Sequence, residues 1–365
     1  MKPHDILFLP GPTEVRAELL EQMARPMIGH RSQQAKELVL RLVGKLPALF
    51  CTRQRALFES VPATLLMEAA IRNLVAKRVL VTTCGAFSER WLEIARACGR
   101  EADALAVEWG EAITPAQLDA ALARGSYDAV TITHNETSTG VMNPLRELAA
   151  VARKHGALVL VDAVSSLAGA PLEFDAWDLD LVFAGVQKCV ALPPGIVLFA
   201  LSERALAKAA TLPGRGFLLD FPRTAAALAK GEPIATPSLS HLFALDAQLD
   251  AIAREGLEAR WARHARMAAR ARAWAAERSL AMYSRDGFHS PTVSTIRVGP
   301  GEAAARLSSA RKSGYVVSNG YGKLKDHTIR IGHMGDHTEA ELERVLAALD
   351  AAGFASAAPT GKTAR

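Results

Sequence analysis

One lysine stands where a charged side chain is costly. In the segment FAGVQKCVALPPG, Lys188 directly follows an apolar run and precedes a Pro-Pro-Gly turn. A buried lysine destabilises a protein unless it is paired, neutral or used chemically. Lys188 could simply extend its amine to solvent at a strand end. It could also be an amine kept partly deprotonated for attack on a carbonyl carbon.

Other residues would complete a site for a phosphorylated aldehyde. Asp162 ends the apolar run ALVLVDA, and its carboxylate could keep a pyridine nitrogen protonated or could merely cap a turn. The segment ESVPATLLMEAAIRNL predicts a helix with Ala63 and Thr64 at its start and Thr64 as N-cap. Backbone N–H groups at such a start bind phosphate. Phe87 could stack on a ring or pack in the core. With Lys188, these residues indicate pyridoxal 5′-phosphate.

The elements that would carry these residues alternate between strand and helix. Continuous apolar runs predict strands at 78–85, 128–134, 157–163, 179–186 and 196–201. Helical patterns separate several of them. Strands buried on both faces and spaced by helices are typical of a largely parallel α/β sheet. The carboxyl ends of such strands gather the chemistry, and Asp162 lies at one of them.

The C-terminal part has a different pattern. A long helical run over 239–278, broken near Gly256, leads to short strand signals at 292–298, 314–322 and 328–336 and a last helix at 338–353. We therefore predict an N-terminal arm (1–14), a large domain (15–255), a small C-terminal α+β domain (256–355) and a disordered tail (356–365). A length of 365 residues fits two unequal domains.

Composition excludes several classes of protein. A net charge of +5 with 22% charged residues is ordinary for a soluble enzyme and indicates no nucleic-acid partner. The four cysteines have neither CxxC nor metal-ligand spacing, so we expect no metal site. We expect their thiols to be reduced and the protein to be cytoplasmic. No run approaches membrane-spanning length.

A stripe of arginines deserves a separate interpretation. Between residues 260 and 272 the predicted helix carries Arg260, Arg263, Arg266, Arg270 and Arg272. Without an accompanying RNA-binding motif, we interpret this stripe as a solvated helix face rather than a nucleic-acid site.

Eight segments in order resemble the class V aminotransferases of pyridoxal phosphate fold type I. They are FLPGPTEV, RPMIGHRS, GAFSERW, HNETSTGVMNP, LVDAVSSLAG, GVQKCVALPPG, TPSLSHLFAL and RIGHMGD. The branch most similar to the chain contains the alanine–glyoxylate and serine–glyoxylate (serine–pyruvate) aminotransferases. The resemblance implies a large domain with a mostly parallel seven-stranded sheet and a homodimer with shared active sites.

The resemblance also implies a role for each matching residue. Lys188 would hold the cofactor and shuttle a proton, and Asp162 would pair with the pyridinium. The remaining expected contacts are Gln187, Ala63 and Thr64 to the phosphate, Phe87 and Thr137 to the ring, Thr236 to the phosphate of the neighbouring subunit's cofactor, and Arg330 and Gly11 to the substrate. Arg330 suits its role because a guanidinium binds a carboxylate through two parallel hydrogen bonds.

The sequence leaves several alternatives open. Pro62 interrupts a phosphate loop that is glycine- and serine-rich in relatives, and it has no N–H to donate. His30 could line the neighbour's site or be structural. The expected activity is transfer of an amino group from alanine or serine to glyoxylate or pyruvate, with aspartate or another donor as an alternative. A sulfur-removing lyase using Cys189 and an accessory cofactor-binding subunit are the other two readings.

Overall fold

The computed structural model describes residues 4–354 and is built around a seven-stranded sheet. The strand order is β2-β10-β9-β8-β5-β3-β4, and only β10 runs antiparallel to its neighbours. This arrangement confirms the mostly parallel seven-stranded expectation. The strands are β2 (Arg55–Glu59), β3 (Arg78–Thr83), β4 (Glu101–Ala106), β5 (Ala129–Thr133), β8 (Leu158–Asp162), β9 (Leu181–Gly185) and β10 (Val197–Leu201).

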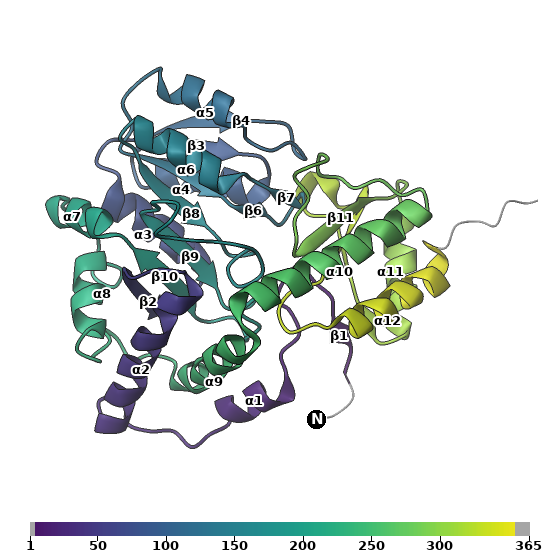
Figure 1. Cartoon of the computed structure of the whole chain (residues 1–365), viewed down its shortest axis with the longest axis horizontal. Helices are drawn as coiled ribbons and strands as arrows, with labels where there is room; N and C mark the ends of the chain where they lie inside the picture. The colour runs from purple at the N-terminus through teal and green to yellow at the C-terminus, as the bar shows by residue number, and fades with distance from the viewer. Residues whose placement is uncertain (1–3, 355–365) are drawn as a thin grey trace, which may run out of the picture.

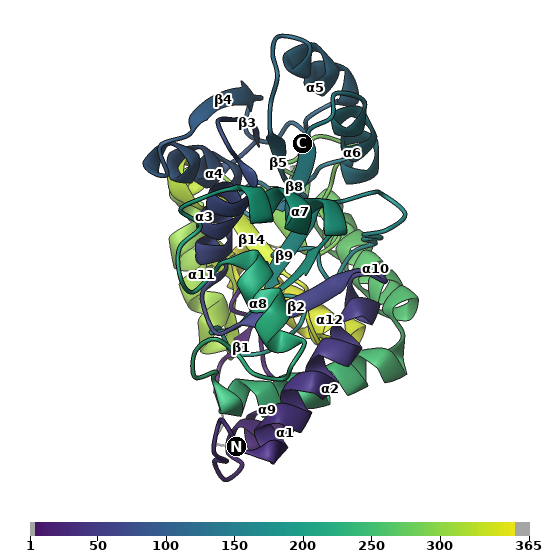
Figure 2. The ribbon, with the colours of Figure 1, turned by 90° about the vertical axis from the view of Figure 1, so that its left-hand side faces the viewer.

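Helices cover both faces of this sheet. Figure 2 shows α3 (Ala63–Leu74) and α4 (Ala86–Ala97) on one side and α5 (Pro115–Leu122) and α6 (Leu145–Lys154) on the other. The residues of the five inner strands β5, β8, β9, β10 and most of β3 are buried because helices lie over them. The other helices of this part are α1 (Ala17–Met23), α2 (Gln33–Leu49), α7 (Glu203–Thr211), α8 (Phe221–Leu228) and α9 (Leu239–Glu255).

A second, smaller sheet forms the C-terminal part. Its order is β11-β14-β13, with all pairs antiparallel. The long helix α10 (Leu257–Glu277) leads from the large sheet to this part, and α12 packs beside it (Figure 1). The elements are β11 (Val293–Arg297), α11 (Glu302–Lys312), β12 (Tyr315–Val316), β13 (Ser318–Asn319), η1 (Gly322–Leu324), β14 (Thr328–Gly332), α12 (Glu339–Leu349) and η2 (Asp350–Phe354). Short strands β6 (Asn135–Glu136) and β7 (Val141–Met142) form a separate hairpin.

Two hydrophobic clusters correspond to the two sheets. Trp91 and the inner strands belong to the larger cluster, whereas Trp274 and α12 belong to the smaller one. Phe8, next to β1 (Ile6–Leu7), also packs in the smaller cluster because β1 pairs in parallel with β12. The helical break predicted near Gly256 is present, with Gly256 at a φ of 82°. The domain boundaries stay predictions, and the predicted tail lies outside the described residues.

The interpretation of the arginine stripe as a solvated face fits Arg266, whose side chain is exposed, but is wrong for Arg260. Arg260 is 2% exposed and pairs with Glu255 (2.7 Å) and Asp336 (2.8 Å). Further along α10, Arg266 and Arg270 pair with Glu339 and Glu343 of α12. The stripe therefore joins α10 to the C-terminal helix through ion pairs that the sequence pattern alone could not reveal.

None of the helices within residues 4–354 is both long and apolar enough to cross a membrane.

Candidate active site

Five strands of the large sheet bring their carboxyl ends to one edge. Because β2, β9, β8, β5 and β3 run in the same direction, the loops after them converge there. A cavity of about 380 Å³ lies at this edge, and we call it the strand-end cleft. Its lining includes eight of the ten predicted site residues: Gly11, Ala63, Thr64, Phe87, Thr137, Asp162, Gln187 and Lys188. Arg330 and Thr236 lie elsewhere.

Lys188 is buried in this cleft, with 9% of its surface exposed. Its Nζ donates a hydrogen bond to the carbonyl oxygen of Pro10. Burial and, next, the positive charge of Arg330 lower the pKa of Lys188 to about 8. The side chain passes so close to Gly11 that a Cβ at residue 11 would lie 2.3 Å from Lys188 Cδ. Glycine at position 11 therefore makes room for the lysine, which is an amine able to act as a nucleophile near neutral pH.

Asp162 ends β8 on the cleft wall and is 4% exposed. Its Oδ1 accepts a hydrogen bond from the Val164 N–H at 2.8 Å. No donor within residues 4–354 bonds to Oδ2. Burial, with a smaller effect of the Glu136 charge, raises the pKa of Asp162 to about 7, although the Val164 hydrogen bond and the charges of Lys188 and Arg90 lower it. A buried carboxylate with a free oxygen can accept a hydrogen bond from the protonated nitrogen of a pyridine ring.

The loop after β3 places Phe87 at the start of α4. The carboxylate of Glu136 accepts hydrogen bonds from the backbone N–H groups of Phe87 (3.3 Å) and Ser88 (2.8 Å). Glu136 is fully buried, and a Cβ on Gly85 would lie 2.5 Å from its Cγ. A buried acid thus satisfies the first turn of α4 and fixes Phe87 beside the cleft. The Phe87 ring centroid lies 5.2 Å from that of Tyr321.

The phosphate loop differs from the expectation in one respect. Helix α3 begins at Ala63 with Pro62 as its N-cap residue, so the prediction of Thr64 as N-cap is wrong. Pro62 suits this position because its φ of −70° is compatible with helix entry and it needs no N–H partner. Thr64 is instead in the first turn of α3 and lines the cleft.

Thr137 and Gln187 line the cleft. The Thr137 Oγ1 and Ser165 Oγ hydroxyls are hydrogen-bonded to each other. Gln187 follows β9, and its carbonyl oxygen accepts a hydrogen bond from the Thr13 N–H at 3.0 Å. The N-terminal segment is thereby bound to the loop that carries Lys188.

Arg330 on β14 is not in the cleft lining but contacts two residues that are, Thr137 and Tyr321. It is 8% exposed, and it donates hydrogen bonds from Nε to Asn319 O (3.1 Å) and from Nη1 to Thr137 O (3.3 Å). No carboxylate forms an ion pair with it in the described part of the chain. Burial lowers the pKa of Arg330 to about 10. A buried guanidinium without a counter-ion is suited to an incoming carboxylate.

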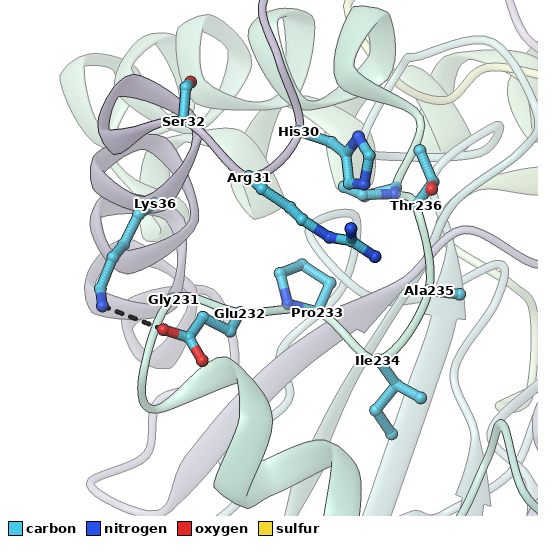
Figure 3. A pocket seen from close by; sticks show the side chains of 11 residues that line it. His30, Arg31, Ser32, Lys36, Gly231, Glu232, Pro233, Ile234, Ala235 and Thr236 are labelled. Carbon is cyan, nitrogen blue, oxygen red and sulfur yellow. Dashed lines mark hydrogen bonds and ion pairs between the residues drawn. The ribbon is translucent and has the colours of Figure 1, made fainter.

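Thr236 lies in a different cavity of about 580 Å³. We call this cavity the loop pocket; it is lined by residues 30–32, Lys36 and 231–237. Figure 3 shows the guanidinium of Arg31 pointing into it between His30 and Pro233, with Thr236 on the far wall. The structure thus places Thr236 and His30 together, but away from Lys188 of the same chain. Close by, the Ser238 N–H donates to Ser60 Oγ at 2.9 Å, which joins this loop to the phosphate loop.

Several cleft residues were not predicted. They include Asn135, whose Nδ2 donates to Ser165 O (2.9 Å) and Thr292 Oγ1 (2.8 Å) while its buried Oδ1 has no partner. Tyr321 and Arg90 also line the cleft. Only Arg90 carried a usable signal, because it follows Phe87 by three residues and so shares its helix face. The others reach the cleft through contacts that link distant segments.

The residues present fit pyridoxal phosphate. Asp162 and Asn135 each offer a buried oxygen without a donor, Lys188 offers an amine of lowered pKa, and α3 offers its N-terminus. Among residues 4–354, no three His, Cys, Asp or Glu side chains lie together as metal ligands would.

Comparisons with known proteins agree with this site. Residues 60–344 match the family "Aminotransferase class-V". The chain is 35% identical to an uncharacterized aminotransferase of Methanocaldococcus jannaschii, covering 95% of this chain and 92% of the other. It is 31% identical to the L-aspartate–glyoxylate aminotransferase of Paracoccus denitrificans, covering 93% and 89%. The alanine–glyoxylate aminotransferase structure from Nostoc sp. has a TM-score of 0.91 at 27% identity, covering 96% of each chain.

The chain belongs to the class V aminotransferases. Members of this family are pyridoxal phosphate-dependent enzymes that transfer amino groups, and the structure has their fold. The fold, the enzyme class and the cofactor expected from the sequence are thus confirmed.

Proposed function

We propose that this aminotransferase transfers an amino group from a small amino acid, alanine or serine, to glyoxylate or pyruvate. The observation that carries the proposal is the buried Arg330 guanidinium, which has no carboxylate partner in residues 4–354. Its charge lies close enough to Lys188 to lower the pKa of the amine. A substrate that offers one carboxylate to Arg330 and an α-amino group toward Lys188 therefore needs only a short skeleton.

The residues of the site have distinct tasks in this reaction. The cofactor, when bound, supplies an aldehyde that accepts the amino group and a protonated ring that takes up electrons. Lys188 holds the cofactor and then moves a proton at the substrate α-carbon. Asp162 keeps the ring nitrogen protonated, Arg330 binds and orients the α-carboxylate, and Phe87 covers the ring. Gln187 and Thr137 are placed to bind polar groups of the cofactor.

Borohydride reduction tests the placement of the cofactor. The holoenzyme treated with borohydride should carry the cofactor on the peptide that contains Lys188, as shown by mass spectrometry. Recovery of the label on another lysine would contradict the assignment.

A half-reaction screen tests the substrates. Purified holoenzyme is mixed with single amino acids, and the change in cofactor absorbance is followed. We expect alanine or serine to react fastest, with glyoxylate or pyruvate reversing the change. Faster reaction with aspartate would favour the alternative donor, which the name of the Paracoccus denitrificans relative also suggests.

The environment of Cys189 argues against the sulfur-removing lyase. Its thiol is 1% exposed and donates to the Ser165 carbonyl oxygen at 3.6 Å. Burial raises the pKa of Cys189 to about 11, so the thiol stays protonated and a poor nucleophile. A Cβ on Gly169 would lie 2.5 Å from its sulfur, which leaves the side chain little room to move. Sulfide release from cysteine should therefore be negligible.

The working unit in this proposal is a homodimer with shared active sites. The loop pocket carries Thr236 and His30 away from Lys188 of its own chain, as expected if they serve the neighbour. A twofold axis would make both contacts occur twice.

The four unpaired cysteines fit a reducing compartment, so we place the enzyme in the cytoplasm.

A further inference from the structure

Arg90 is a cation at the cleft that the reaction as described above does not use. It lies on α4 one turn after Phe87, is half-buried, and lines the strand-end cleft. Its guanidinium carbon is 5.0 Å from the centroid of the Phe87 ring. Its Nη1 donates a hydrogen bond to Thr64 Oγ1 at 3.3 Å. The side chain therefore bridges from the ring-covering residue to the first turn of α3.

The charge of Arg90 has no protein counter-ion. No carboxylate within residues 4–354 forms an ion pair with it. Other arginines of the same region are paired, such as Arg72 with Glu68 (2.8 Å) and Arg78 with Asp103 (2.5 Å). Arg90 is nevertheless close enough to Asp162 that its charge lowers the pKa of that carboxyl against the larger effect of burial. An unpaired guanidinium at a cleft wall is available for an anionic ligand.

The first turn of α3 has few free donors for a phosphate. Pro62 has no N–H, and the Leu65 N–H already donates to Pro62 O at 3.0 Å. The N–H groups of Ala63 and Thr64 remain. A phosphate monoester carries up to two negative charges, and two neutral donors with a helix dipole compensate them only partly.

We propose that Arg90 binds the phosphate of the cofactor, as the cationic half of a site whose neutral half is the start of α3. Its planar group can donate two parallel hydrogen bonds, which replaces the donor that proline removes. The hydrogen bond to Thr64 holds the guanidinium beside the two free N–H groups. The inference rests on the proposed placement of the cofactor at Lys188.

The location of Arg90 favours phosphate over a second carboxylate of the substrate. Arg90 contacts Thr64 and Phe87, which belong to the phosphate and ring sides of the cleft. The substrate side is marked by Arg330, which bonds to Asn319 and Thr137. An anion held by Arg90 is therefore expected at the opposite end from the reacting amino group.

The test compares two ligands that differ only in the phosphate. Apoprotein is titrated with pyridoxal phosphate and with pyridoxal, and binding is followed by fluorescence and by borohydride labelling of Lys188. Arg90→Gln should weaken binding of pyridoxal phosphate about 10- to 100-fold, the range for a lost charge-assisted hydrogen bond, and change pyridoxal binding less than about twofold. Arg90→Lys should fall between wild type and Arg90→Gln. Inorganic phosphate should compete with pyridoxal phosphate in wild type more strongly than in Arg90→Gln.

Arg96→Gln is the matched control. Arg96 is exposed in the last turn of the same helix, so this variant makes the same charge change away from the cleft and should bind both ligands as wild type does. Equal weakening of both ligands in Arg90→Gln would mean that Arg90 only supports Phe87 and would overturn the proposal. So would unchanged cofactor affinity with a raised KM for dicarboxylic donors alone. Labelling of Lys188 in every variant would show that the cofactor site itself stands, whichever way the Arg90 result falls.

Discussion

The strand-end cleft and the loop pocket both have charged side chains in their lining, but these side chains differ in how far they are exposed. Lys188 and Asp162 in the cleft and Arg330 beside it are each less than a tenth exposed, and burial shifts the pKa of all three. In the loop pocket, Lys36 and Glu232 form a 3.1 Å ion pair with side chains 41% and 62% exposed. Burial by the sheet and its helices thus shifts the pKa of these side chains and makes them reactive. The charged groups of the loop pocket stay exposed and are suited to binding.

The two cavities carry different parts of the proposed active site. The cleft contains an amine, an acid and a helix start, yet it lacks Thr236. The loop pocket contains Thr236 and an arginine, and the amine of its Lys36 is exposed and paired with Glu232. In the proposed homodimer the two would complete each other, and the following changes separate their contributions.

The largest effect is expected from Lys188→Ala. Loss of the amine removes both the covalent attachment point and the proton carrier, so transamination should fall by at least about 10³-fold. The variant should still bind the cofactor without covalent attachment, because the phosphate contacts remain. Single-turnover kinetics and absorbance after gel filtration measure both. Substantial residual turnover would mean that another base does this work.

Asp162→Asn should reduce turnover on the order of 10²- to 10³-fold while the cofactor still binds. An amide cannot stabilise a protonated ring nitrogen, so electrons released at the substrate α-carbon are poorly accommodated. Near-normal single-turnover rates in this variant would contradict the role of the carboxylate.

The same substitution should make the apoprotein more stable above neutral pH. The pKa of Asp162 is about 7 when folded and 3.8 ordinarily, mainly because of burial. The folded state therefore holds this proton more tightly, and wild type loses stability as pH rises from about 4 to 7. Asparagine has no carboxyl to ionise, so the free energy of unfolding of the variant should exceed that of wild type by at most about 4 kcal/mol at pH 8. Thermal unfolding of both apoproteins should differ at pH 8 and converge near pH 4.

Thr236→Val should weaken cofactor retention about tenfold, a smaller effect because one hydrogen bond to a charged group is lost. Mixing Lys188→Ala chains with Thr236→Val chains tests where that bond is made. In a heterodimer with shared sites, one site has both residues intact and the other lacks both. Wild-type affinity at about half of the heterodimer sites is expected. A fully active monomer, or no recovery on mixing, would show that the loop pocket serves no neighbouring cleft.

The smallest effect concerns the pH at which Lys188 reacts. Burial first and the charge of Arg330 second lower the pKa of Lys188 to about 8. Capture of pyridoxal phosphate by apoprotein should therefore accelerate through pH 8, because only the neutral amine attacks. Arg330→Gln removes a positive neighbour and should move this midpoint upward, slowing capture at pH 7 by about two- to fivefold. Stopped-flow rates across pH measure the shift; an unmoved midpoint would mean that burial alone sets it.

The sequence by itself determined the inner sheet and most of the cleft. Lys188 and Asp162 follow continuous apolar runs, and such runs form buried strands wherever helices cover both faces. The carboxyl ends of parallel strands lie at the same edge of a sheet. The sequence pattern was therefore enough to predict that residues at these ends lie close together. Gly11 and Thr137 were added to the predicted site through the family resemblance.

Only the tertiary structure decided the features that depend on distant partners. The edge strand β4, with the sequence EADALA, has helix-forming residues and becomes a strand because it pairs with β3. Arg260 is buried because Glu255 and Asp336 meet it there. Arg90 became a phosphate candidate only because it lies beside Thr64 and forms no ion pair with a carboxylate of residues 4–354. The periodicity of a sequence indicates which face of a helix or strand is buried. Which residue of another element contacts that face depends on how the elements pack.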